Sequence, residues 1–191
     1  SSSISFNIDE TLPSVSIVYP QNSSYNVNVS ELNYTVSESG GSCWYSNSSG
    51  VWNSSVVNAG VNFTKVVSVV DGNEWTLYCN DSVGNKNSTS VSFFKDVTNP
   101  VITIGDGTLP FAAAPVRDFI YVNVSVVEDN EDSIRFILYN SSEDIINNSF
   151  YSDGTRTINW TNLSAGTYYL GVLVNDTSGN LDQYQNYIMN F

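Results

Sequence analysis

Apolar and polar positions alternate along most of the chain, in short runs that are separated by turn-forming residues. In residues 29–37, for example, Leu32, Tyr34 and Val36 alternate with polar residues, which is the period of a half-buried strand. Residues 119–127 show the same pattern, and no helical period is evident. We place turns at 38–41, 71–73 and 128–132. We expect strands at 14–19, 29–37, 43–46, 63–70, 74–79 and 88–95, and again at 101–104, 119–127, 133–139, 145–151, 155–160 and 167–174.

Two six-residue segments of nearly identical sequence divide this series of strands into two halves. Residues 80–85 read NDSVGN and residues 175–180 read NDTSGN, 95 positions apart. Each follows one strand-like run and precedes another, so each is expected to be a hairpin turn in which glycine tolerates positive φ. About seven short strands per half predict an all-β chain of two antiparallel sandwiches with Greek-key connections, at residues 10–95 and 96–191.

The first nine residues look like the end of a repeat and not like its beginning. Residues 1–17 share eight identities in seventeen with residues 88–104, and residues 88–95 form the last expected strand of their repeat. Residues 1–9 are therefore interpreted as the last strand of a preceding repeat, or as a strand that completes a domain of another subunit. An unstructured tail is the third interpretation.

The composition places most of the polar surface on uncharged side chains. The 191 residues include 30 Ser, 13 Thr and 25 Asn, and charged residues make up 13%, about half of the usual share. The net charge of −13 disfavours nucleic acid and anionic membranes as partners. Residues 10–95 carry −3 (six acids, three Lys) and residues 96–191 carry −9 (twelve acids, three Arg). No apolar run approaches the roughly 18 residues of a membrane span, and we interpret the chain as a segment of a longer precursor.

Both halves open with the pattern Pro-x-Val/Ile-x-Ile and contain the closing pattern Asn-Asp-x-x-Gly-Asn. Together with the seven-strand spacing, these patterns resemble tandem immunoglobulin-like (Ig-like) or fibronectin-III-like repeats of archaeal and bacterial cell-surface proteins. The resemblance covers essentially the whole chain. It implies two tandem Ig-like β-sandwich domains with an extra N-terminal strand, in an extracellular stalk, adhesin, S-layer or filament, and it carries over no catalytic residue. The opening pattern consists of Pro13, Val15, Ile17, Pro100, Ile102 and Ile104.

The two cysteines, Cys43 and Cys79, lie on the third and sixth expected strands of the first half. Those strands are neighbours in one sheet of such a sandwich, so a disulfide is sterically plausible, and an extracellular location favours it. The closed loop would contribute roughly 3–4 kcal/mol to stability. The alternative is a pair of buried thiols. At the matching places of the second half we expect Phe136 and Val174 as an apolar pair.

Fourteen Asn-x-Ser/Thr sequons occur, against roughly six expected by chance from the composition. Part of the excess follows from alternation, because strands place polar residues at i and i+2 in any case. We expect several sequons to carry N-linked glycans. Asn33, Asn123 and Asn159 point away from the apolar face of their expected strands. Asn80 and Asn175 could instead cap the hairpin turns. The sequons are Asn22, Asn28, Asn33, Asn47, Asn53, Asn62, Asn80, Asn87, Asn123, Asn140, Asn147, Asn159, Asn162 and Asn175.

Acidic residues converge near the expected turns at one end of the second half, where they could bind Ca²⁺ as hard oxygen ligands. Their spacing fits no known calcium loop, so a solvated acidic turn is the favoured interpretation. The chain contains no His, which excludes Ser-His-Asp, Cys-His and His-ligated zinc sites. We therefore expect no catalytic residue, no metal site and no cofactor. The acidic residues are Asp96, Glu128, Asp129, Glu131, Asp132 and Asp176.

Tryptophans and one apolar loop are the remaining candidates for contact surfaces. Trp75 and Trp160 alternate with polar neighbours and are expected in the core, whereas Trp52 lies in the polar loop 47–60. The apolar segment 109–115 is expected to pack against a neighbouring domain or subunit.

Three functions are consistent with these features. The leading hypothesis is an extracellular, glycosylated structural protein, whose partners are copies of itself or neighbouring repeats, together with N-linked glycans. The second is an adhesin or carbohydrate-binding module that uses loop 47–60 with Trp52. The third is an accessory domain of a secreted hydrolase. The first predicts that residues 1–8 pair with a sandwich that lacks its last strand. The second predicts saturable ligand binding that is lost in Trp52→Ala, and the third predicts catalytic sequence just outside this segment.

Overall fold

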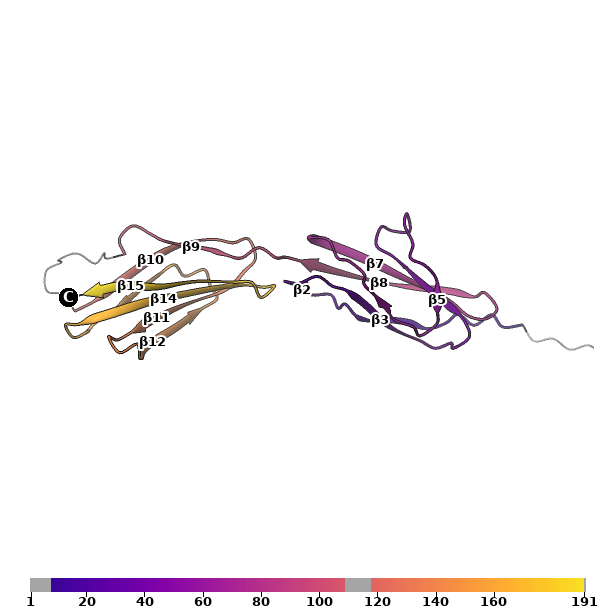
Figure 1. Cartoon of the computed structure of the whole chain (residues 1–191), viewed down its shortest axis with the longest axis horizontal. Coiled ribbons are helices and arrows are strands. Elements are labelled where there is room, and N and C mark those ends of the chain that lie inside the picture. The colour runs from indigo at the N-terminus through magenta and orange to yellow at the C-terminus, as the bar shows by residue number, and fades with distance from the viewer. Residues whose placement is uncertain (1–7, 109–117, 191) are drawn as a thin grey trace, which may run out of the picture. The chain divides into compact units, whose positions relative to one another are not determined.

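The chain divides into two compact units, one ending at Asp96 and the other starting at Val97 (Figure 1). The computed structural model describes residues 8–108 and 118–190, without the side chains of 186–190. Within these residues, no helix is long and apolar enough to cross a membrane. The two parts are called unit 1 and unit 2 below.

Unit 1 is a sandwich of two sheets. The smaller sheet has the order β1-β3-β6 and the larger sheet the order β2-β8-β7-β4-β5. All pairings are antiparallel except that of β2 with β8, which is parallel. The strands are β1 (Val15–Tyr19), β2 (Ser24–Tyr25), β3 (Glu31–Val36), β4 (Ser42–Ser46), β5 (Val57–Asn58), β6 (Phe63–Thr64), β7 (Asp71–Asn80) and β8 (Lys86–Lys95).

Unit 2 repeats this architecture with a four-stranded larger sheet. Its sheets have the orders β13-β10-β9 and β12-β11-β14-β15, with antiparallel pairing throughout the described residues. Because neighbours in these sheets are often far apart in sequence, the connections are of the Greek-key kind. The strands are β9 (Val101–Ile104), β10 (Ile120–Val127), β11 (Glu131–Tyr139), β12 (Ile145–Tyr151), β13 (Thr157–Trp160), β14 (Thr167–Asp176) and β15 (Leu181–Asn190).

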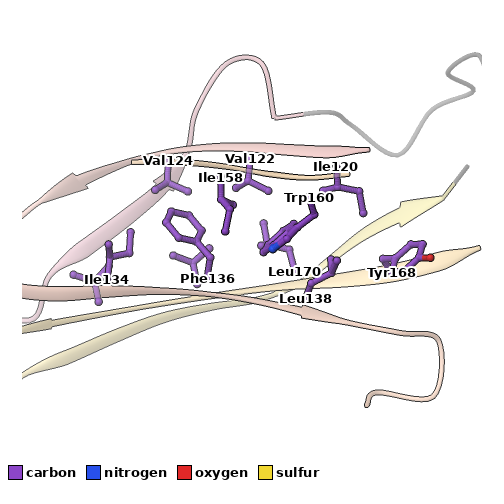
Figure 2. Packing of buried hydrophobic residues seen from close by; sticks show 12 residues of the cluster. Ile120, Val122, Val124, Ile134, Phe136, Leu138, Ile158, Trp160, Tyr168 and Leu170 are labelled. Carbon is purple, nitrogen blue, oxygen red and sulfur yellow. The ribbon is translucent and has the colours of Figure 1, made fainter. Parts of the chain in front are cut away.

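The core of unit 2 follows directly from the alternation of its strands (Figure 2). Ile134, Phe136 and Leu138 of β11 are buried, and they face the buried residues of β10 across the sandwich. Trp160 of β13 fills the space between the two sheets and is buried, as its alternating neighbours predict. The second half is therefore confirmed as a β-sandwich.

The core of unit 1 is built in the same way around a tryptophan. Trp75 of β7 is 1% exposed, and its ring meets that of Phe93 edge to face, with ring centroids 4.9 Å apart. Leu32 of β3 is fully buried in the same cluster. The prediction of an all-β chain of two tandem β-sandwich units is thus confirmed.

One predicted strand and one predicted turn of unit 1 are wrong. The strand expected at 63–70 ends after Thr64, where Lys65 has a φ of +62°, and the turn expected at 71–73 lies inside β7. The buried side chain of Asn73 explains the difference. Its Oδ1 accepts a hydrogen bond from the Val69 N–H at 2.9 Å, and its Nδ2 donates to the Val69 carbonyl at 2.9 Å. This clamp holds the apolar run before β7 as a loop, although its composition favours a strand.

Two sequence predictions fall outside the part of the chain that the structure describes. These are the additional strand at residues 1–8, of which only Ile8 is described, and the apolar loop segment 109–115. Both stay predictions.

Candidate functional site

The repeated hairpin turns are held by one buried carboxylate each. In unit 1, Oδ1 of Asp81 accepts hydrogen bonds from the N–H groups of Val83, Gly84 and Asn85, at 2.9, 2.7 and 2.9 Å. Its Oδ2 accepts a bond from Nδ2 of Asn85 at 2.8 Å. Gly84 has a φ of +102°, which an L side chain would strain. The motif therefore specifies a clamped turn.

The turn of unit 2 uses the same chemistry. Oδ1 of Asp176 accepts hydrogen bonds from the N–H groups of Ser178 and Asn180, both at 2.8 Å. Its Oδ2 accepts a bond from Nδ2 of Asn180 at 2.7 Å. The capping residue is thus the aspartate in each copy, and not the preceding asparagine that the sequence suggested. In unit 1 that asparagine, Asn80, instead accepts a bond from the N–H of Ser42 on the neighbouring strand.

The clamp also changes the acidity of Asp81. Burial raises the pKa of this carboxyl, but the hydrogen bonds from the Asn85 side chain and from three backbone N–H groups stabilise the anion and outweigh that effect. The net result is a pKa below the ordinary value. The turn is therefore strongest when Asp81 is ionised.

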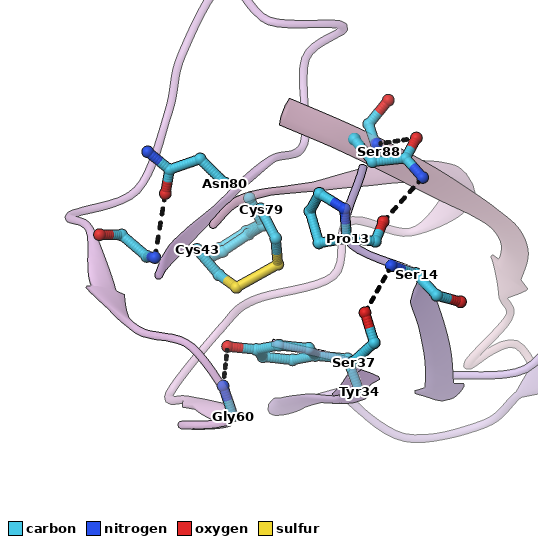
Figure 3. The surroundings of a disulfide bond; sticks show 12 residues. Pro13, Ser14, Tyr34, Ser37, Cys43, Gly60, Cys79, Asn80 and Ser88 are labelled. Carbon is cyan, nitrogen blue, oxygen red and sulfur yellow. Dashed lines mark hydrogen bonds between the residues drawn. A yellow bond between two sulfur atoms is a disulfide. The ribbon is translucent and has the colours of Figure 1, made fainter. Parts of the chain in front are cut away.

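Cys43 and Cys79 form a disulfide in the core of unit 1 (Figure 3). They stand directly opposite each other on β4 and β7, with Cα atoms 4.1 Å apart, and both are fully buried. The bond therefore joins neighbouring strands of one sheet. In Ig domains of antibodies the bridge instead joins the two sheets.

The apolar pair at the matching place in unit 2 is different from the one expected. Val174 stands opposite Ile134, and Phe136 stands opposite Val172. The turn motif places Val174 at the position of Cys79, so Ile134 and not Phe136 replaces Cys43. The expected residue on β11 was wrong by two positions, because the turn before β11 has a different length from the one before β4.

Three sequons present exposed asparagines whose side-chain amides form no hydrogen bond with the described residues: Asn22, Asn47 and Asn159. Asn159 lies on the exposed face of β13 between the buried residues Ile158 and Trp160, which agrees with its predicted direction. A glycan attached at these positions would project from the surface of the folded unit.

Other sequons use the asparagine amide inside the fold. Nδ2 of Asn123 donates to the Asp106 carbonyl at 2.9 Å, and Nδ2 of Asn87 donates to the Pro13 carbonyl at 2.9 Å. Asn123 is half-buried and lies between two buried residues of β10, so it points away from the core as expected, and its glycosylation stays a prediction. Asn140 closes the turn between β11 and β12 with both side-chain atoms. The fourteen sequons therefore differ in how accessible their asparagines are.

The remaining sequons are intermediate cases. Asn28 and Asn62 are exposed and accept hydrogen bonds through their carbonyl oxygens, from Ser68 and from the Tyr34 N–H. Asn147 accepts a bond from the hydroxyl of Ser149, its own sequon partner, at 2.8 Å. The others, on strands, turns and loops, are Asn33, Asn53, Asn80, Asn162 and Asn175.

The acidic residues of unit 2 are mostly engaged in turn and ion-pair contacts. Carboxylate oxygens of Glu128 and Asp176 lie within 4.8 Å of each other. Oε1 of Glu128 accepts the Asn130 N–H at 2.9 Å, and Asp176 clamps its turn. Glu131 forms a two-point ion pair with Arg156 that the sequence had not indicated. These contacts make the carboxylates of Glu128, Glu131 and Asp176 parts of the fold.

Aromatic side chains reach the surface at two places in unit 1. Trp52 is 50% exposed and contacts Tyr45 edge to face at 5.6 Å. On the outer face of the larger sheet, the rings of Trp44 and Tyr78 stack at 5.7 Å, and the Lys86 ammonium lies 4.8 and 4.7 Å from their centroids. The lysine covers that pair, so Trp52 is the more accessible ring.

Comparisons with known proteins identify the fold and no more. No protein-family model and no curated protein matches the chain. The fibronectin(III)-like modules of Clostridium thermocellum CbhA align with 92% of this chain and 94% of theirs, at 14% identity and a TM-score of 0.56. A solved segment of titin aligns with 95% of this chain and 66% of its own length, at 10% identity and a TM-score of 0.59. The chain therefore has the fold of tandem fibronectin-III-like and Ig-like domains.

Proposed function

We propose that the chain is part of an extracellular structural glycoprotein, in which tandem Ig-like units form a stalk, S-layer or filament on an archaeal or bacterial cell. The observation that carries the proposal is the duplication of one sandwich, closed both times by the same aspartate-clamped turn. A unit that is held by its own core and its own turn chemistry can be repeated many times, which suits an extended array.

The disulfide and the surface composition support an extracellular location. Disulfides persist in oxidising compartments and are rare where thiols are kept reduced, and Cys43–Cys79 is buried in the centre of unit 1. The surface relies on Ser, Thr and Asn, with charged residues at only 13% of the chain. Sugars on some of the sequons would add solvation that the few charges do not provide.

The proposed partners are copies of this chain or neighbouring repeats of a longer chain. The likeness in sequence between residues 1–9 and residues 88–96 supports this, because a strand with this pattern can pair with the edge of another sandwich. The accessible sequons Asn22, Asn47 and Asn159 are the positions where we propose N-linked glycans first.

Protein isolated from its native source tests the proposal. Electron microscopy is expected to show regular filaments, lattices or stalks, and mass spectrometry of peptides is expected to find glycans on Asn22, Asn47 or Asn159. The peptide of Asn123, whose amide is bonded within the fold, is the internal control with lower expected occupancy. Isolated globular particles without glycopeptides would contradict the proposal.

A second function, adhesion through loop 47–60, is favoured by one observation. Trp52 is half-exposed beside Val51, which is 90% exposed, so the loop tip presents an apolar surface. The expected result is saturable binding to a surface or glycan that Trp52→Ala abolishes. Val27→Ala changes a 60% exposed residue elsewhere in unit 1 and is the matched control. Binding that survives Trp52→Ala would contradict this second function.

A further inference from the structure

A hollow of about 250 Å³ lies on the larger sheet of unit 2. Its lining includes Tyr139, Tyr169 and Gln185, which alternate with core residues and therefore belong to the outer face of the sheet. Glu143, from the turn between β11 and β12, completes the rim. Two aromatic rings, one carboxylate and one amide thus converge on one small space.

A glycine inside β14 allows the close position of the Tyr139 ring, which lines this hollow. A Cβ added to Gly171 would lie 3.1 Å from Cε2 and 3.6 Å from the hydroxyl of Tyr139. Only the absence of a side chain lets the Tyr139 ring lie close over β14. Because glycine in the middle of a strand weakens it, its presence here calls for a reason beyond the sheet itself.

The matching place in unit 1 is built from different side chains. Thr76 stands four residues before the turn motif of unit 1, as Gly171 does in unit 2, and the partner of each on the last strand is Ser90 or Gln185. The hydroxyls of Thr76 and Ser90 bond to each other at 2.9 Å. In unit 1 this place therefore holds two hydroxyl groups, whereas in unit 2 it holds a glycine that the Tyr139 ring lies against.

Glu143 is held at the rim in a backbone conformation that glutamate rarely adopts. Its φ is +65°, in the left-handed region that favours glycine or asparagine. The turn around it is rigid, because Oδ1 of Asn140 accepts the N–H groups of Ser142 and Asp144, both at 2.9 Å. Glu143 is thus held at the rim by a turn that the Asn140 side chain fixes.

We propose that this hollow is a binding subsite for one ring of a neutral saccharide. Tyrosine rings pack against the C–H faces of a pyranose, and the Glu143 carboxylate and Gln185 amide can bond neighbouring hydroxyls. The volume is below the roughly 300–1,000 Å³ of pockets for drug-sized ligands, which suits a single sugar ring. The −9 charge of residues 96–191 (twelve acids, three Arg) disfavours acidic sugars. Binding would be an activity in addition to the structural role.

The test is an NMR titration of the whole ¹⁵N-labelled chain, made in a host without N-glycosylation so that its own glycans are absent. The probes are methyl glucoside, methyl mannoside, methyl galactoside and N-acetylglucosamine, with glucuronate and tetramethylammonium for comparison. At least one neutral sugar is expected to shift the amides of Tyr139, Glu143 and Gly171 at about millimolar concentration, as is usual for weak ligands.

Variants then locate the site. Tyr169→Ala and Glu143→Gln are expected to weaken binding at least tenfold, and Gly171→Ala to weaken it less, because the added Cβ shifts the Tyr139 ring by only a few tenths of an ångström. Ser90→Ala in unit 1 is the matched control with unchanged binding. Glu143→Gln changes an exposed side chain, so the variant is expected to fold and a loss of binding can be assigned to the hollow.

Three outcomes would overturn the inference: no neutral sugar shifts these amides, only tetramethylammonium does, or Glu143→Gln binds as tightly as the wild type. None of these outcomes bears on the proposed structural function, which is tested separately by imaging and by glycopeptide analysis of the native protein.

Discussion

The two units join the same pair of neighbouring strands in different ways. In unit 1 the disulfide Cys43–Cys79 links β4 to β7, whereas in unit 2 Ile134 and Val174 face each other at the same place on β11 and β14. All four residues are 1% exposed or less. One fold therefore accepts either a covalent link or apolar packing at this position, and unit 2 depends more completely on the fit of its side chains.

The units also differ on their outer faces and edges. Unit 1 joins the hydroxyls of Thr76 and Ser90 by a hydrogen bond on its outer face and adds β2 in parallel beside β8. Unit 2 has a hollow lined by Tyr139 and Tyr169 on its larger sheet, and within its described residues no strand pairs with the outer edge of β15. The two units thus differ in the side chains of one sheet face and in the pairing of one sheet edge.

The largest expected effect comes from the core of unit 2, which has no covalent link. Phe136 is fully buried, so Phe136→Ala should destabilise this unit by about 3–5 kcal/mol through lost burial and the cavity that remains. Hydrogen exchange of peptides from each unit, measured in urea, locates the change. The matched control is Phe150→Ala, since Phe150 is 56% exposed. Equal loss of protection in both units would contradict the separation of the cores.

Removal of the disulfide should leave unit 1 without a covalent link between β4 and β7, so that its stability depends on side-chain packing as that of unit 2 does. The variant Cys43→Ala with Cys79→Ala is expected to lose roughly 3–4 kcal/mol of unfolding free energy, because the closed loop no longer restricts the unfolded chain. Urea unfolding with and without a reductant measures this for the wild type as well. A wild type that is insensitive to the reductant would show that the bond does not stabilise the unit.

The reciprocal change sharpens the same comparison. Ile134→Cys with Val174→Cys places two thiols at the position that the disulfide occupies in unit 1, and oxidation is expected to raise the unfolding free energy of unit 2, by up to roughly 3–4 kcal/mol. Phe136→Cys with Val174→Cys is the control, since these residues are not opposite each other. A bond that forms equally well in the control would contradict the register.

A smaller effect is expected from the clamped turn of unit 1 and depends on pH. The folded pKa of Asp81 is lowered, so its contribution is fully present above the unfolded pKa of about 3.9 and is lost as the pH falls through the folded value. Asp81→Asn should therefore lower the Tm of unit 1 at neutral pH, and the difference from the wild type should shrink below about pH 4. A difference that stays constant down to pH 2 would contradict the role of the ionised carboxylate.

The smallest expected effect is that of the surface pair in unit 1. Ser90→Ala removes one exposed cross-strand hydrogen bond and should cost only about 0.2–1 kcal/mol, which urea unfolding can measure. A larger loss of unfolding free energy would mean that the Thr76–Ser90 hydrogen bond contributes more to the stability of the sheet than an exposed cross-strand pair usually does.

Much of the fold could be predicted because alternation reports burial directly. Leu32 and Trp75 alternate with polar neighbours and are buried as expected, and the repeated turn motif divided the chain into two sandwiches. Prediction failed at residues 63–70, where valines favour a strand by composition but the Asn73 side chain holds the chain in a loop. The site residues were less predictable, because a sequon does not show whether its amide is bonded elsewhere, as that of Asn123 is.

The sequence by itself determined the all-β class, the duplication, the core positions and the two cysteines that could meet, since these depend on local periodicity and on repeated letters. Only the tertiary structure decided that Ile134 faces Val174, that Asp81 and not Asn80 caps its turn, and that the Tyr139 ring lies against Gly171. The physical reason is that register, capping and surface shape arise from contacts between strands that are distant in sequence, where a shift of one or two residues changes every partner.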